Sequence, residues 1–223
     1  MVFKEKITSS GKLEKLKARF CARGDMEKDI PGEDNWSSCV SQRTVRMFLA
    51  HATKEKRTVL QLDFIGSYLQ ARMRARMFIK LQPELAKFFP DLSEYFFKAL
   101  LLNKTLYGLT EAAKFWNTEL TQWLKNNTFG FFHNPQKIQA YISGMMEKDH
   151  GFILFFMLMM DYITETVRKQ KKFFNALSSN FNVESKGYAH WFLGMRINRH
   201  CDGSYTIDHY RFVSEYHYQI LSQ

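Results

Sequence analysis

The sequence has little cysteine, and what it has is not spaced for cross-linking or for zinc. Its 223 residues include three cysteines, Cys21, Cys39 and Cys201, with no C-x-x-C pair among them. An odd number of widely separated cysteines supports neither a disulfide framework nor a zinc site. The seven histidines show no metal-ligand spacing either. We therefore expect reduced thiols in a cytoplasmic or nuclear protein.

Long apolar runs are also missing. The longest uninterrupted run, Phe152–Met160, has nine residues, whereas a membrane-spanning helix needs about 20. Residues 1–20 lack the apolar segment of a secretory signal. These absences predict a protein that is soluble and intracellular, or a piece cut from one that is. Although charge alone leaves an acidic membrane as a second candidate, our expectation is no membrane partner.

Positive charge is what the sequence has in excess. The formal net charge is +10, while 45% of residues are hydrophobic and 21 are phenylalanine, so the chain is foldable rather than disordered. A basic, foldable chain of this size favours a polyanionic partner, with nucleic acid first and an acidic membrane second. A crowded ribonucleoprotein assembly is a further possibility. We interpret the basic run 168–172 as a solvent-exposed surface rather than a binding site.

The apolar periodicity mixes helices and strands without regular alternation, which favours an α+β fold. A hairpin is expected over 2–23, turned at 9–11, with Lys17, Arg19 and Arg23 on one face of its second strand. The other expected elements are helices over 41–54, 111–126 and 167–180, strands over 58–64 and 77–81, two or three strands within 139–165, and a hairpin turned at Asp202-Gly203.

Two aspartates stand at the ends of apolar strands. Asp63 ends "VLQLD" and Asp161 ends "FFMLMMD". Nucleotidyl transfer by two Mg²⁺ ions needs carboxylates gathered where strands end. An aspartate in this position also commonly caps or begins a turn. The residues alone leave both interpretations open.

Seven sequence blocks, taken in order, resemble one family. They include "GKLEKLKARFCARG", "LQLDFIGSYLQ", "LNKTLYGLTEAAKFW", "FFMLMMDYIT" and "GYAHWFLGMRI". They are similar to the reverse transcriptase of copia-type LTR retrotransposons, in blocks such as Q-L-D-V, S-L-Y-G-L-K-Q-A, Y-V-D-D and F-L-G. The ordered set covers nearly the whole chain.

The resemblance implies a right-hand polymerase with a palm and partial fingers, in which helices back an antiparallel palm sheet. Residues 1–57 would be partial fingers, 58–186 the palm with inserted fingers elements, and 187–223 the palm end and the start of the thumb or connection. The implied activity is RNA-directed DNA polymerisation, adding dNTPs to a primer on an RNA or DNA template with Mg²⁺. Implied partners are other Pol regions or a larger assembly, in a virus-like particle if the element is active.

The resemblance also implies roles for individual residues. Asp63 and Asp161 match catalytic metal ligands, and Tyr68 matches the aromatic gate that excludes a 2′-hydroxyl. The implied nucleotide-binding residues are Lys17, Arg19, Phe64 and Tyr68. The implied primer and template residues are Arg23, Tyr107, Gly108, Trp191, Phe192, Leu193 and Gly194.

One departure from the family pattern bears directly on the chemistry. Met160 stands where Y-V-D-D has its first aspartate, and a neutral thioether is a poor ligand for Mg²⁺. Neighbouring residues on a strand point to opposite faces, so Asp161 does not simply replace the missing carboxylate. We therefore expect an impaired polymerase. The alternatives are a non-catalytic nucleic-acid-binding relic and a structural subunit recruited into a larger assembly.

Overall fold

The chain combines helices with small antiparallel sheets, which confirms the predicted α+β class. The computed structural model describes residues 2–7, 12–26, 41–74, 76–80, 90–95, 98–126, 153–156 and 166–209. It forms two compact units. Unit 1 comprises Met1–Trp36 and Ser67–Leu120, and unit 2 comprises Ser37–Gly66 and Thr121–Gln223. The predicted division into fingers, palm and thumb stays a prediction.

Unit 1 begins with the predicted hairpin. Strands β1 (Val2–Ile7) and β2 (Leu13–Arg19) pair antiparallel, and the expected turn at 9–11 lies outside the described residues. The prediction that Arg23 continues the alternating face of β2 is wrong, because the strand ends at Arg19. Beyond it the chain makes a single bridge at Cys21 and turns in η1 (Gly24–Met26).

The rest of unit 1 is built from short elements and the first part of one long helix, whose residues from Thr121 onward belong to unit 2. Helix α2 (Ser67–Gln70) precedes a small hairpin of β4 (Phe78–Lys80) and β5 (Ala99–Leu101), and η3 (Pro90–Tyr95) lies between these strands in sequence. Helix α3 (Ala112–Asn126) begins one residue later than predicted. The sequence did not predict β5, because three residues are too few to reveal an alternating pattern.

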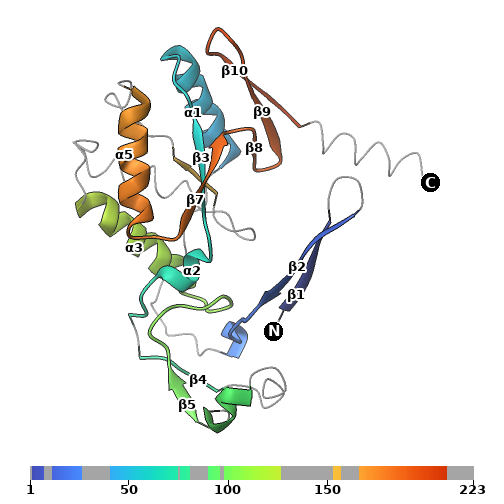
Figure 1. The fold of residues 1–223 in the computed structure, drawn as a ribbon, viewed down its shortest axis with the longest axis vertical. Helices are drawn as coiled ribbons and strands as arrows, with labels where there is room; N and C mark the ends of the chain where they lie inside the picture. Colours follow the sequence, from blue (N-terminus) through green and yellow to red (C-terminus); the bar gives the residue numbers. More distant parts are fainter. Residues whose placement is uncertain are drawn as a thin grey trace. The chain divides into compact units, whose positions relative to one another are not determined.

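A three-stranded antiparallel sheet lies at the centre of unit 2. Strand β3 (Leu60–Phe64) runs between β6 (Ile153–Phe156) and β7 (Val183–Tyr188), and Figure 1 shows β3 and β7 side by side. The sequence did not predict β7, since only its first residue is buried. The other strands expected within 139–165 lie outside the described residues.

Unit 2 has two further clusters of packed side chains. Helix α1 (Gln42–Lys54), capped by the Ser41 hydroxyl, shares one with the sheet of β8 (Trp191–Phe192), β9 (Met195–Arg199) and β10 (Tyr205–Asp208). This upper core contains Val45, Leu49, Ala52, Val59, Ala189, Phe192, Met195 and Ile197. The second is an aromatic cluster near α5 (Thr166–Ser178), made of Phe64, Trp123, Phe173 and Phe181.

The predicted hairpin at Asp202-Gly203 is confirmed, because β9 and β10 pair on either side of it. No helix within the described ranges is long and apolar enough to cross a membrane.

Candidate functional site

Three of the predicted site residues meet in unit 1. The Arg19 guanidinium carbon lies 5.6 Å from the centre of the Tyr107 ring. The Tyr107 ring meets the Tyr68 ring edge to face, with centroids 5.1 Å apart and planes at 71°. We call Arg19, Tyr68 and Tyr107 the ring cluster. Cationic and aromatic groups so arranged suit the phosphates, sugar and base of a nucleotide.

Close backbone contact brings the ring cluster together. The Ala22 amide donates to the Tyr107 carbonyl at 2.7 Å. At Gly108, where φ is +86°, an added Cβ would lie 2.3 Å from the Ala22 carbonyl oxygen. At Gly24 it would lie 1.9 Å from the Gly108 carbonyl oxygen. Backbone atoms at these distances leave room only for glycine.

The chain beyond β3 holds Tyr68. The Thr105 hydroxyl and the Ala71 amide both donate to the Tyr68 carbonyl, and the Thr105 amide donates to the Ala71 carbonyl at 3.1 Å. Thr105 is fully buried. These bonds fix the backbone of the segment that carries the Tyr68 ring. The sequence analysis did not single out Thr105 for this role.

Two other basic residues predicted to bind nucleotide or primer–template, Lys17 and Arg23, are close to Arg19 in sequence. Lys17 is half-buried on β2 and lies opposite Lys4 of β1. Arg23 forms an exposed ion pair with Asp25, with Nη2 and Oδ2 2.7 Å apart. Hydrogen bonds from this guanidinium lower the pKa of the Asp25 carboxyl. For its guanidinium to bind a phosphate instead, Arg23 must first break its ion pair with Asp25.

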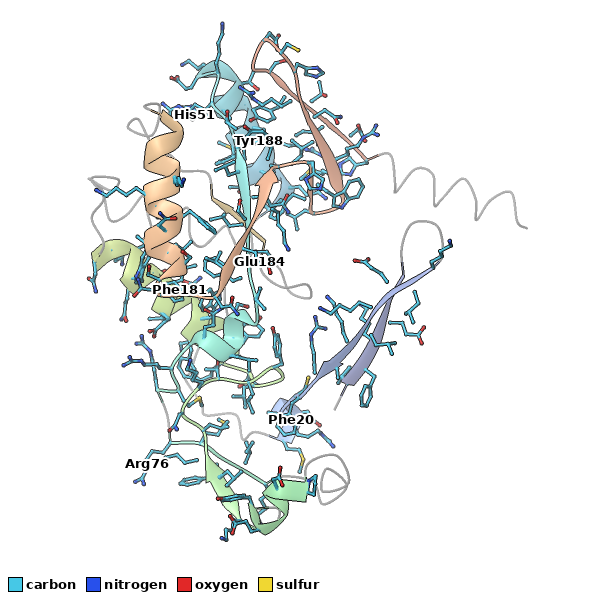
Figure 2. All side chains as sticks on the ribbon, in the orientation of Figure 1. Phe20, His51, Arg76, Phe181, Glu184 and Tyr188 are labelled. Carbon is cyan, nitrogen blue, oxygen red and sulfur yellow. The ribbon has the colours of Figure 1, made fainter. Side chains whose placement is uncertain are left out.

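In unit 2, Asp63 lies on the central strand of the sheet. Its partner across the β3–β7 pair is Glu184, labelled in Figure 2. The Lys186 ammonium lies 2.6 Å from Glu184 Oε2 and 3.8 Å from Asp63 Oδ2. We call these three residues the ion-pair cluster. The hydrogen bond to Glu184, above all, raises the pKa of Lys186, and the Asp63 charge adds to the effect.

The ion-pair cluster by itself does not fit a two-metal centre. A pair of Mg²⁺ ions needs several carboxylates around it, and the described residues contain no group of three or more His, Cys, Asp or Glu that could hold a metal. Among the described residues, the Lys186 ammonium lies 3.8 Å from Asp63 Oδ2. Asp161 and Met160 lie outside the described residues.

Phe64 and Phe192 are buried, although the family resemblance implies that Phe64 binds nucleotide and Phe192 binds primer or template. The Phe64 ring meets the Phe181 ring at 5.9 Å in the aromatic cluster, and Phe192 belongs to the upper core. Each residue, backbone included, is 1% exposed. Neither residue therefore presents an accessible surface to a nucleotide or primer as the structure has them.

The segment Trp191–Gly194 consists of strand β8 and the two-residue turn, Leu193 and Gly194, that joins it to β9. Phe192 pairs with Met195, and both residues between them have positive φ, +48° at Leu193 and +76° at Gly194. This is the pattern of a type I′ turn. Leu193 also accepts a hydrogen bond from the Gln42 side chain at 3.4 Å. Non-glycine residues rarely have positive φ, and when they do they often mark functional sites.

Glu184 and Lys186 were missed by the sequence analysis. Both lie on β7, which was not predicted, because "VESKGY" carries too few apolar residues to read as a strand. The available signal was a pair of opposite charges two residues apart, a spacing that places both side chains on one face of a strand.

Known proteins match this chain over nearly its whole length, as the ordered sequence blocks do. A family model described as reverse transcriptase (RNA-dependent DNA polymerase) matches residues 1–219. The Retrovirus-related Pol polyprotein from transposon RE2 of Arabidopsis thaliana is 26% identical over 219 residues, which is 93% of this chain and 14% of that protein.

A second relative is similar to the same degree. The Pol polyprotein from transposon TNT 1-94 of Nicotiana tabacum is 26% identical over 199 residues, 89% of this chain and 14% of its own length. The chain thus spans about one seventh of these relatives. No solved structure matches it. The family-model match over nearly all of its length shows that the chain belongs to the reverse transcriptase family, as a domain related to those of copia-type retrotransposon Pol polyproteins.

Proposed function

We propose that this chain binds an RNA or DNA primer–template and a dNTP, and that its nucleotidyl transfer is impaired. The observation that carries the proposal is the ring cluster. Three residues that the family resemblance assigns to nucleotide and primer–template binding, far apart in sequence, come together because Arg19 and Tyr68 both contact the Tyr107 ring. The net charge of +10 supports a polyanionic partner.

In the proposed mechanism the ring cluster binds the incoming nucleotide. Arg19, with Lys17 two residues before it, offers positive charge to the triphosphate. The Tyr68 ring blocks a 2′-hydroxyl, so the site prefers deoxyribose. The turn at Leu193 supports the primer end. These roles fit a polymerase with fingers over 1–57, a palm over 58–186 and a palm end over 187–223.

The chemical step is proposed to be the weak part. Mg²⁺ supplies charge neutralisation at the transferred phosphate in such reactions, and its proposed ligands here are Asp63 and Asp161. With Met160 in place of a carboxylate, the site lacks one of its anions. The ammonium beside Asp63 favours the alternative of a non-catalytic nucleic-acid-binding relic.

Primer extension on an RNA template, measured beside primer–template binding, tests the proposal. We expect the wild type to bind with a steep salt dependence, since each phosphate contact releases counterions. Extension should be slow, and Asp63→Asn should abolish it without weakening binding. Binding with no extension at all would favour the relic. Failure to bind nucleic acid would instead favour a structural subunit and contradict the proposal.

In cells, the proposed partners are other Pol regions or a larger assembly. The proposed location is the cytoplasm, the nucleus or a virus-like particle.

A further inference from the structure

Lys186 lies between two carboxylates on neighbouring strands. Asp63 of β3 pairs in register with Glu184 of β7, and Lys186 follows Glu184 by two residues, on the same face of the strand. Its ammonium is 2.6 Å from Glu184 and 3.8 Å from Asp63. The strand register thus sets the spacing of three charges.

The shorter of the two contacts fixes the position of the ammonium. The 2.6 Å contact with Glu184 is a charge-assisted hydrogen bond, which is short and directional. It keeps Lys186 within reach of Asp63 rather than free in solvent. Glu184 therefore acts as the group that positions the lysine.

The effect on Asp63 is electrostatic. The Asp63 side chain is 24% exposed and that of Lys186 is 40% exposed, so the charges are only partly screened by water. Exposed ion pairs add little to folding stability. A positive charge 3.8 Å from a carboxylate does, however, oppose the approach of a divalent cation to the same oxygen.

We propose that Lys186, positioned by Glu184, is an internal counter-ion of Asp63 that lowers the affinity of this carboxylate for divalent cations. The inference rests on the proposed function, because it concerns the carboxylate proposed to be catalytic. The lysine balances the negative charge of Asp63 at the centre of the sheet, and a metal ion must compete with it.

Mn²⁺ binding to the full chain, followed by the electron paramagnetic resonance signal of free Mn²⁺, tests the proposal. Lys186→Met should tighten binding by about 5- to 1,000-fold, the range expected for a unit charge about 4 Å away between the limits of bulk water and a protein surface. The gain should vanish in Lys186→Met/Asp63→Asn. Glu184→Gln should not tighten binding, because Lys186 then pairs with Asp63 alone.

Lys171→Met is the matched control, since it removes one positive charge from an exposed position on helix α5. Circular dichroism verifies folding of each variant, and Lys186→Gln replaces Lys186→Met if the latter does not fold. Equal Mn²⁺ affinity in Lys186→Met and Lys171→Met overturns the inference. Tighter Mn²⁺ binding supports it even where primer extension is absent, in which case only the proposed catalysis fails.

Discussion

The two units hold their candidate site residues by different physical means. In unit 1 the ring cluster depends on backbone segments so close that only glycine fits between them. In unit 2 the ion-pair cluster depends on strand register, which sets Glu184 opposite Asp63. The first arrangement is the proposed nucleotide site. The second already contains a positive charge beside the carboxylate that is proposed to bind metal. The proposed metal site is therefore less suited to its role than the proposed nucleotide site.

The largest expected effect tests the core that supports the turn at Leu193. Phe192→Ala should lower the free energy of unfolding by about 3–5 kcal/mol, because it removes a buried aromatic side chain and leaves a cavity. Denaturant unfolding measures the loss. Tyr188→Ala is the control, because that side chain is 68% exposed and its removal should change stability by about 0.5 kcal/mol or less. Similar losses in both variants would contradict the placement of Phe192.

A smaller loss is expected where unit 1 depends on glycine. Gly108→Ala combines positive φ with a clash against the Ala22 carbonyl and should destabilise the chain by about 2–4 kcal/mol. Gly187→Ala is a matched control, because φ is also positive there but nothing lies within 4 Å of the added Cβ. It should lose only about 1–2 kcal/mol. Thermal unfolding of the two variants side by side separates strain from clash, and equal losses would refute the close contact.

The ring cluster itself is tested by nucleotide affinity. Tyr107→Ala should weaken dNTP binding to the primer–template complex by about 3- to 30-fold, since it removes the ring that faces Arg19. Tyr107→Phe keeps the ring and should have a much smaller effect. Fluorescence titration with a labelled dNTP measures both. Unchanged affinity in the alanine variant would separate the ring cluster from nucleotide binding.

The smallest expected effect is on stability at the ion-pair cluster. Lys186→Met should change the free energy of unfolding by less than about 1 kcal/mol, because all three side chains are partly exposed. It should also leave dNTP affinity unchanged. A loss above about 2 kcal/mol in a denaturant titration would mean that Lys186 is a structural residue instead.

Much of this architecture could be predicted from the sequence. The α+β class, helix α1 and the hairpins at both ends follow from periodicity and turn residues, and ordered motifs identified the family. The ring cluster could not be derived from spacing, because Arg19 and Tyr107 are brought together by backbone contacts of Cys21 and Ala22 with Tyr107, which no sequence pattern reveals. Likewise, β7 has too few apolar residues to be recognised as a strand, so the position of Glu184 and Lys186 beside Asp63 could not be predicted.

The most direct test of the account is single-turnover primer extension by Met160→Asp beside the wild type, with primer–template binding measured on the same samples. The account predicts equal binding and faster extension in the variant, because a missing metal-ligating carboxylate is restored. The gain should disappear in Met160→Asp/Asp63→Asn. Equal extension rates in two folded, binding-competent proteins would contradict the claim that the lost carboxylate limits catalysis.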